Sequence, residues 1–214
     1  MKNTFLSFLV LCLACSFIYA QDVPISSRHE LHFYIINGYA VSYKFPSKGI
    51  LNYRVNVDFG AHYGDLSGKS SVDYYNNNRG DINRALNITL TPQIYVYFLS
   101  TEYAKMYAGG GAFITYEYNK QHTDQSYNHD KNSSSAITKN ACYSLGLSAL
   151  IGIETELAKH IMLFAESQIN GGRQWTEAES SYFNNEGYHS QHNETERTWF
   201  TNYSNIRIGL GVYF

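Results

Sequence analysis

Apolar and polar residues alternate one by one along most of the chain beyond residue 28. Successive side chains of an extended strand point to opposite faces, so a period of two predicts β-strands with one apolar and one polar face. The clearest run is Leu51 to Tyr63, whose odd-numbered residues are apolar or aromatic and whose even-numbered residues are polar or glycine. This part of the chain shows no convincing helical periodicity. Further strands are predicted at 28–45, 86–98, 105–118, 141–154, 161–170 and 205–214.

The connections between these strands alternate in length. Three are short and three are long and rich in Asn, Ser, His and Tyr: 46–49, 99–103 and 156–160 are the short ones, and 66–83, 119–137 and 172–198 are the long ones. Short turns at one end and long polar loops at the other are typical of a transmembrane β-barrel. The strands are also long enough, because a tilted membrane strand needs roughly 9 to 11 residues.

An antiparallel β-sandwich also has alternating strands, and it is the main alternative fold. Besides the alternation of short and long connections, two features favour the barrel. The predicted strands are longer than the usual length of roughly five or six residues. Their polar face carries Gly, Ser, Asn and Thr, which suit a crowded barrel interior, whereas strands that face water favour long charged side chains. The sequence therefore predicts an all-β fold, an antiparallel transmembrane β-barrel.

The number of strands depends on how residues 28–45 fold. Bacterial barrels have an even number of strands, with both ends on the periplasmic side. Seven strands are clear, so we expect an eighth from a hairpin with its turn at Asn37-Gly38. The apolar residues on both sides of this turn are odd-numbered, so a three-residue turn or a bulge is needed to keep them on one face. A single bent strand over 28–45 is the alternative.

The first 20 residues begin with a positive charge, continue with an apolar run and end in a small residue. This is the layout of a secretory signal peptide, with cleavage expected after Ala20. Cleavage before Cys15, as in a lipoprotein, is the alternative, but Cys12 stands three residues earlier where a leucine is usual. The exported chain then consists of a short N-terminal segment at 21–28 and a barrel domain at 29–214.

The composition argues against a disulfide-stabilised fold and against nucleic-acid binding. Cys142 is the one cysteine left after export, so no internal disulfide framework is expected. The formal net charge of −2 gives no basic footprint for nucleic acid, and no such partner is expected. The 20 tyrosines, beside 3 prolines, fit strands whose side chains lie where an apolar wall meets water.

The last predicted strand has an apolar residue at every second position and ends on an aromatic one: Ile206, Ile208, Leu210, Val212 and Phe214. Its sequence IRIGLGVYF resembles the C-terminal signature of bacterial outer-membrane proteins. YAGGGAFITYEY at 107–118 and the Ala20-Gln21 junction resemble small OmpA/OmpX-like outer-membrane β-barrel proteins of the Bacteroidota. The resemblance implies a barrel in the outer membrane, in contact with membrane lipid and lipopolysaccharide. It also implies that the barrel-assembly machinery reads the last strand and Phe214.

The polar faces of the predicted strands direct seven charged residues into the barrel: Arg54, Asp58, Lys105, Glu117, Glu154, Glu166 and Arg207. An eight-stranded barrel is only wide enough for side chains to fill it. Charges buried there must pair or be solvated, because an isolated one costs several kcal/mol. We therefore expect a polar network that fills the lumen. The alternative is a narrow solute path, as in a small porin-like channel.

Lipid A-modifying enzymes share this barrel size and give a second alternative function. They would need His with Ser, or His with Asp and Ser, near the outer rim. The candidates are His62 with Asp65 and Ser67, and His189 with Ser190. Polar loops collect these residue types by composition alone, and a catalytic set is recognised by its geometry. We therefore expect no catalytic residue and no cofactor.

The predicted loops also hold imidazoles and carboxylates of the kind that bind transition metals: His122, His129, His189 and His192, with Glu186 and Glu194. Mobile loops rarely hold ligands in place, so no metal site is expected. Aromatics among Ser, Asn and Gly are typical of recognition surfaces, so we expect loops 66–83, 119–137 and 172–198 to contact an extracellular partner. Trp175 and Trp199, near strand ends, are assigned to the interfacial aromatic girdle.

Overall fold

The computed structural model describes residues 28–36, 39–47, 49–72, 75–101, 103–127, 133–203 and 206–214. The predicted signal peptide and the turn at Asn37-Gly38 lie outside the described residues. No helix in the described part is long and apolar enough to cross a membrane. The described residues form nine strands: β1 Glu30–Ile36, β2 Ala40–Phe45, β3 Asn52–Val72, β4 Tyr75–Ser100, β5 Lys105–Tyr127, β6 Ser133–Ala158, β7 Ile161–Asn184, β8 His189–Tyr203 and β9 Arg207–Tyr213.

These strands form an antiparallel ring with eight positions. Each strand from β1 to β7 pairs with the next, β9 pairs with β7, and β9 also pairs with β1 and closes the ring. β8 and β9 share one position, because β9 pairs with residues 161–166 of β7 and β8 pairs with residues 169–183. The predicted eight-stranded antiparallel barrel is confirmed.

Residues 28–45 form a hairpin, so the alternative of a single bent strand is wrong. In the register of β1 and β2, Leu31 lies opposite Tyr43 and Phe33 opposite Val41. Odd residues therefore face odd residues, which keeps the apolar side chains of both strands on one face. Glu30 and Lys44, a buried pair from the even set, point inward.

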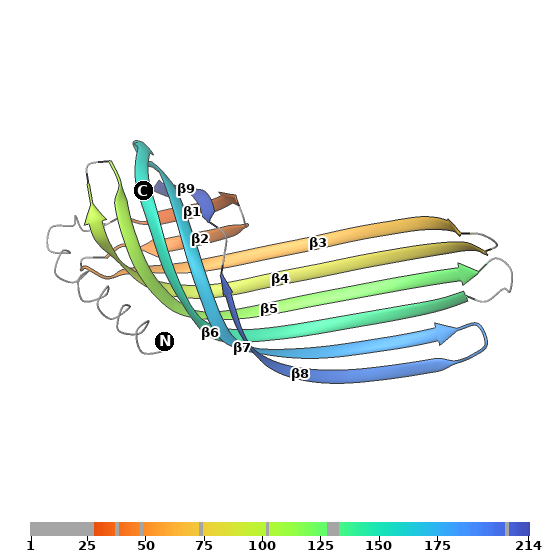
Figure 1. The fold of residues 1–214 in the computed structure, drawn as a ribbon. Helices are drawn as coiled ribbons and strands as arrows, with labels where there is room; N and C mark the ends of the chain where they lie inside the picture. The colour runs from red at the N-terminus through yellow and green to blue at the C-terminus, as the bar shows by residue number, and fades with distance from the viewer. Residues whose placement is uncertain are drawn as a thin grey trace.

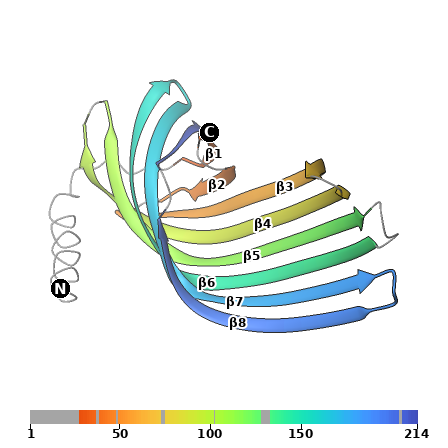
Figure 2. The same cartoon turned by 45° about the vertical axis from the view of Figure 1, so that its right-hand side comes forward.

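The three segments that we expected to be long loops are mostly strand, and that expectation was wrong. β3 and β4 stay paired as far as Val72 and Tyr75, and β5 and β6 as far as Ser126 and Ser133. Backbone hydrogen bonds hold these extensions, and such bonds need no apolar side chain. Figures 1 and 2 show the result: β3 to β8 run far beyond the short β1, β2 and β9 as a curved sheet. The short connections after β2, β4 and β6 are found where predicted.

The long hairpins change the shape of the barrel along its length. β2 pairs with β3 only as far as Asp58, and the pairing of β1 with β9 ends at Ile36 and Ile208. Beyond this level, β3 and β8 are the two edges of a six-stranded sheet, and the β1–β2 hairpin stays at the short-turn end, beside the start of β3 (Figure 2). The molecule is therefore a closed ring at its short-turn end and an open trough at its long-hairpin end.

Apolar side chains point outward and polar ones point inward, which is the reverse of a soluble protein. Ile114 is 56% exposed and Leu147 is 71% exposed, whereas the inward side chains of the closed ring are largely polar or charged. Large contiguous apolar surfaces of this kind mark a membrane or protein contact. We call this outward surface the apolar belt; its exposed members include Val57, Phe59, Leu86, Ile88, Leu90, Ile94, Ile114, Leu145, Leu147, Ile151, Ile153, Ile161 and Ile169.

Glycine allows close strand contact at one inward position of β5. A Cβ on Gly111 would lie 1.8 Å from the backbone oxygen of Pro92 on β4. Real Cβ atoms do not come so close, so only glycine fits this stretch of β4 and β5 without a backbone shift. Gly60, in contrast, has room, because its Cβ would meet Asn87 Cβ at 3.9 Å.

Candidate functional site

The interior of the closed ring is organised around Glu166, which is 2% exposed and points inward from β7. Its Oε2 accepts a hydrogen bond from Arg54 Nη2 at 2.8 Å and one from Tyr107 Oη at 3.1 Å. Its Oε1 accepts one from Arg207 Nη2 at 2.7 Å and one from Tyr34 Oη at 2.9 Å. Both carboxylate oxygens are thus saturated by donors from four other strands, which offsets the cost of burying the charge.

The two arginines extend this network across the ring. Arg54 donates from Nε to Gln93 Oε1 at 2.8 Å. Arg207 donates from Nη1 to Asp58 Oδ1 at 2.5 Å and from Nη2 to Gln168 Oε1 at 2.8 Å. Each guanidinium also lies near an aromatic ring: the Cζ of Arg207 is 4.6 Å from the ring centre of Tyr34, for example. We call Arg54, Asp58, Glu166 and Arg207 the plug; its two guanidinium groups and two carboxylates balance in charge.

The plug lies where the closed ring ends. Asp58 is opposite Ala40, the first residue of β2, and Tyr34 is the last residue of β1 opposite β2. Glu166 and Arg207 are the last pair between β7 and β9 before β8 takes over as the partner of β7. The charged groups therefore form a layer between the closed ring and the open trough.

A second group of buried charges lies below the plug, toward the short turns. Lys44 Nζ donates to Glu30 Oε1 at 2.7 Å and to Tyr97 Oη at 2.8 Å. Tyr97 Oη in turn donates to Glu154 Oε1 at 2.6 Å. His32 Nε2 lies 3.1 Å from Glu30 Oε2. We call Glu30, His32, Lys44, Tyr97 and Glu154 the basal cluster.

The seven predicted lumen charges fall into separate groups. Arg54, Asp58, Glu166 and Arg207 come together in the plug, and Glu154 belongs to the basal cluster. The other two, Lys105 and Glu117, are not among the hydrogen-bonded members of either network. Lys105 lies over the ring of Tyr97, with Nζ 5.7 Å from the ring centre. Glu117 lies higher in the trough, where Asn87 Nδ2 donates to its Oε1 at 2.9 Å.

Sequence reasoning missed several members of these networks. Glu30, His32 and Lys44 are even-numbered residues of the first hairpin, and its odd residues had been assigned to the apolar face. The same alternation therefore contained the signal that these three point inward. Tyr95, Tyr97 and Tyr107 are buried on the inward face to which alternation assigns them. Their contacts with the charged groups were not expected, because aromatic residues fit both faces of a barrel.

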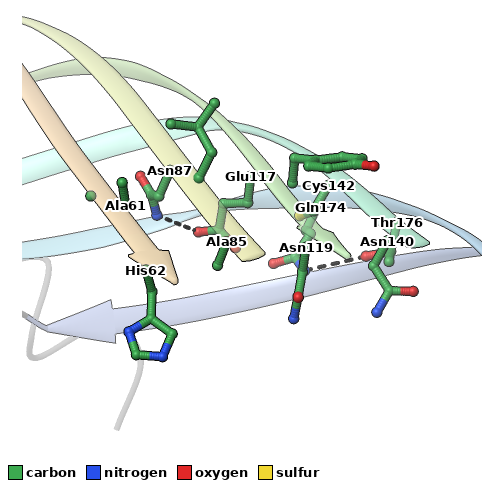
Figure 3. Close-up of a pocket in the computed structure, with 13 residues that line it drawn as sticks. Ala61, His62, Ala85, Asn87, Glu117, Asn119, Asn140, Cys142, Gln174 and Thr176 are labelled. Atoms are coloured by element: carbon green, nitrogen blue, oxygen red, sulfur yellow. Dashed lines mark hydrogen bonds between the residues drawn. The ribbon is translucent and has the colours of Figure 1, made fainter. Parts of the chain in front are cut away.

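Above the plug, the inner face of the trough carries a cavity of about 550 Å³ that is lined by both polar and apolar residues. It begins at Gly60, two residues beyond Asp58 on β3, and we call it the vestibule. Figure 3 shows amide, hydroxyl and carboxylate groups of four neighbouring strands around it. Its polar lining side chains include His62, Asn87, Glu117, Asn119, Asn140, Gln174 and Thr176.

The arrangement can hold water and small polar solutes in the vestibule but leaves little room for passage below it. Long side chains fill the closed ring, and the largest of those with almost no exposure are Arg54, Tyr95, Tyr107, Lys44 and Phe164. This agrees with the general size of eight-stranded barrels, whose interior is just wide enough for side chains.

The candidate catalytic groups show no assembled triad among the residues that the structure describes. The side chains of Asp65 and Ser67 lie outside that part, so their relation to His62 stays a prediction. His189 and Ser190 are neighbours on β8. Adjacent strand residues point to opposite faces, so these two side chains do not share a site.

The candidate metal ligands are dispersed in the described part of the chain. His122 Nε2 lies 2.9 Å from Ser135 Oγ and 3.1 Å from Asp124 Oδ1. His192 and Glu194 are 4.0 Å apart on the exposed β8. His129 lies outside the described residues. No group of three or more His, Cys, Asp or Glu side chains that could hold a metal ion occurs among the described residues.

Comparison with known proteins gives distant structural matches. No family model matches the sequence, and no curated protein matches it. A major outer membrane protein from Thermus thermophilus is 12% identical, covering 87% of this chain and 98% of its own at a TM-score of 0.35. CarO from Acinetobacter baumannii is 12% identical (91% and 99% covered, TM-score 0.35), and CarO2 from the same organism is 12% identical (90% and 100% covered, TM-score 0.37). At this level of similarity, the assignment of the fold rests on the strand pairing of the chain itself.

Proposed function

We propose that the chain is an integral β-barrel protein of the bacterial outer membrane, without enzymatic activity, that presents its long hairpins for structural or recognition roles. The observation that carries this proposal is the apolar belt around a polar, charge-filled interior. In water, such an outward surface would drive association, whereas in a bilayer it faces hydrocarbon. The closed ring leaves no unpaired strand edge at the level of the plug, as a lipid environment requires.

The height of the apolar belt fits a membrane. On β6, outward residues from Tyr143 to Ile153 are aromatic or apolar. This stretch is about 34 Å long at the usual rise per residue. With a strand tilt of about 40°, its height along the barrel axis is about 26 Å, close to the apolar band of bacterial outer-membrane barrels.

The long hairpins should lie outside the cell and the short turns in the periplasm, since bacterial barrels have this asymmetry. Segments 66–83, 119–137 and 172–198 would then be available to an extracellular partner, and their described residues are mostly strand rather than loop. The end of the β7–β8 hairpin exposes aromatic side chains among polar ones, which suits recognition. Tyr182, Phe183 and Tyr188 are exposed there, and the rings of Tyr182 and Tyr188 lie 6.2 Å apart.

The outward face of the last strand supports a role in assembly. Phe214 is 70% exposed, and its backbone N–H donates to the carbonyl of His29 at 3.1 Å. We propose that the barrel-assembly machinery reads this face, Ile206, Ile208, Leu210, Val212 and Phe214, during insertion. Membrane lipid and lipopolysaccharide would surround the belt afterwards. The resemblance to OmpA/OmpX-like proteins of the Bacteroidota stays a prediction.

A small porin-like channel is the second candidate function. The vestibule favours it, because an open cavity with amide, carboxylate and hydroxyl groups in its lining could admit a solute. The plug argues against it, because a solute would have to displace the ion pairs of Glu166 with both arginines. A non-conducting barrel with structural or recognition roles is therefore better supported than a channel.

Membrane fractionation and heat-modifiable gel mobility test the proposal. The protein should sediment with outer membranes, resist extraction by high salt and run at a different mobility before and after boiling. A closed barrel survives mild detergent until heat unfolds it, which explains the expected shift. A protein that is monodisperse in buffer without detergent, with one mobility at all temperatures, would contradict the proposal.

A further inference from the structure

We infer that the outward surface just beyond the apolar belt, on the long-hairpin side, binds the phosphate groups of membrane lipids. The inference rests on the proposed membrane location. We call the outward-facing cations of this surface the basic rim: Arg84, Lys120, Lys139, Arg173 and Arg197.

The best-formed part of the basic rim is Arg173 on β7. Its Cζ lies 5.6 Å from the ring centre of Trp175 and 5.9 Å from that of Trp199. Stacking on ring faces positions a guanidinium while its N–H groups, which lie in its own plane, stay free to donate. Within the described part of the chain, no carboxylate lies within ion-pair distance of Arg173. An arginine held in this way suits bidentate binding of phosphate.

A second arginine shows the same arrangement on the other side of the trough. The Cζ of Arg84 on β4 lies 5.5 Å from the ring centre of Tyr63, its direct neighbour on β3. Lys120 is opposite Arg84, and Lys139 is opposite Lys120. Like charges directly opposite on neighbouring strands destabilise a sheet. An anion bound across this row would remove that repulsion.

Acidic groups on the same surface offset part of this charge. Lys139 Nζ lies 3.1 Å from Glu179 Oε2, and Glu177 follows the same outward face of β7. Asp124, farther along β5, is a third outward carboxylate, and its Oδ1 lies 3.1 Å from His122 Nε2. Five cations against these three carboxylates leave the described rim positive. The cations are also spread over β4 to β8, so the positive surface follows the wall of the trough.

The position of the rim points to a lipid rather than to a dissolved anion. Arg173 is opposite Leu145, an exposed member of the apolar belt. An open cavity of about 760 Å³ beside them is lined by apolar side chains such as Leu147 as well as by Arg173, Trp175 and Trp199. A phosphorylated lipid would place its acyl chains on the belt and its phosphate on the rim. Tryptophan and tyrosine at this boundary suit the interfacial girdle of a barrel.

Lipid titration of the purified protein in mild detergent, followed by native mass spectrometry, tests the inference. The probes are lipid A with both phosphates, the same lipid without phosphates, and inorganic phosphate. We expect the phosphorylated lipid to bind most tightly to the wild type, and its binding to weaken as NaCl is raised. Arg173→Gln should raise its Kd about tenfold, the usual scale for a charge-assisted hydrogen bond. The Kd of Arg173→Lys should lie between those of the wild type and Arg173→Gln, because lysine keeps the positive charge but lacks the planar guanidinium group.

Lys159→Gln is the matched control, since it removes one exposed positive charge at the short-turn end. It should bind the phosphorylated lipid like the wild type. Equal Kd values for Arg173→Gln and Lys159→Gln, equal binding of both lipid forms, or tighter binding of inorganic phosphate would each overturn the inference. Heat-modifiable mobility is measured for every variant. A wild type that fails to insert into membranes contradicts the proposed function, whereas a well-inserted wild type with no phosphate preference contradicts this inference alone.

Discussion

Glu166 and Arg207 are direct cross-strand neighbours on β7 and β9, and Arg207 Nη2 lies 2.7 Å from Glu166 Oε1. This pair stands at the seam that closes the ring, next to the point where β7 changes its partner from β9 to β8. Arg54 reaches the other oxygen of the same carboxylate from β3, across the barrel. One carboxylate thus connects the closing strand with the opposite wall.

Glu166→Gln should destabilise the barrel by about 3 to 5 kcal/mol, because it leaves two buried guanidinium groups without their shared negative charge. Water reaching the site from the vestibule would reduce the loss, since solvated pairs contribute less. The unfolding midpoint in urea, followed by the gel mobility of unboiled samples, measures the change.

Glu117→Gln is the control for that variant. Glu117 is exposed in the vestibule and has an amide partner, Asn87, instead of an arginine. The substitution should change the free energy of unfolding by no more than about 0.5 kcal/mol, as most exposed substitutions do. Equal midpoints for the two variants would show that Glu166 is not held in a sealed network.

The wild-type barrel should be electrically silent in a planar bilayer. Replacing Arg54 and Glu166 together by serine removes two of the bulky side chains that fill the ring while keeping the net charge, and small conductance steps should appear. Lys139→Ser with Glu179→Ser removes an ion pair on the outer face and should remain silent. Steady conductance of the wild type would contradict the sealed interior and favour the channel.

Within the apolar belt, alternation alone predicted which face a side chain takes, because a barrel with an apolar outer surface and a polar interior imposes it on every strand. It assigned Arg54 and Glu166 to the interior, where both are buried, and Leu147 to the exterior, where it is exposed. It could not show that Arg54 pairs with Glu166, which is 112 residues away and lies on the far wall. Such partners depend on register, tilt and ring closure, and these belong to the whole sheet.

The long hairpins were not predictable from the same signal. Beyond the belt, both faces of a strand are polar, so residues such as Asn78 and Ser135 carry no apolar period although they are paired in strands. Asn, Ser and Gly also have low strand propensity, and here neighbouring hairpins overcome it. The division of the last ring position between β8 and β9 is likewise not revealed by any local pattern.

Gly111→Ala should lower the folded fraction on refolding into detergent. Its Cβ would lie 1.8 Å from the Pro92 oxygen, so β4 and β5 would have to separate, and overpacking of this kind costs about 1 to 3 kcal/mol. Gly60→Ala is the matched control, with its nearest contact at 3.9 Å. Similar refolding yields for both variants would show that the close contact between β4 and β5 at Gly111 does not limit folding.

Phe214→Ala should lower the amount of folded protein in cell membranes several-fold, if the outward face of the last strand is read during assembly. The side chain is exposed and its backbone bond to His29 is retained, so refolding of the purified variant into detergent should match the wild type. Phe45→Ala, another exposed aromatic at the same end, is the control. A loss of refolding in detergent as well would assign Phe214 a structural role instead.

Single cysteines on a Cys142→Ser background should reveal which end lies outside the cell. Glu186 is exposed at the tip of the β7–β8 hairpin, and Lys159 is exposed in the turn between β6 and β7. An impermeant maleimide added to intact cells should label Glu186→Cys and leave Lys159→Cys unlabelled, because the long hairpins are expected outside and the short turns in the periplasm. After the outer membrane is permeabilised, both should react, which shows that both thiols are accessible. Labelling of Lys159→Cys but not of Glu186→Cys on intact cells would reverse the proposed orientation and place the basic rim toward the periplasmic leaflet.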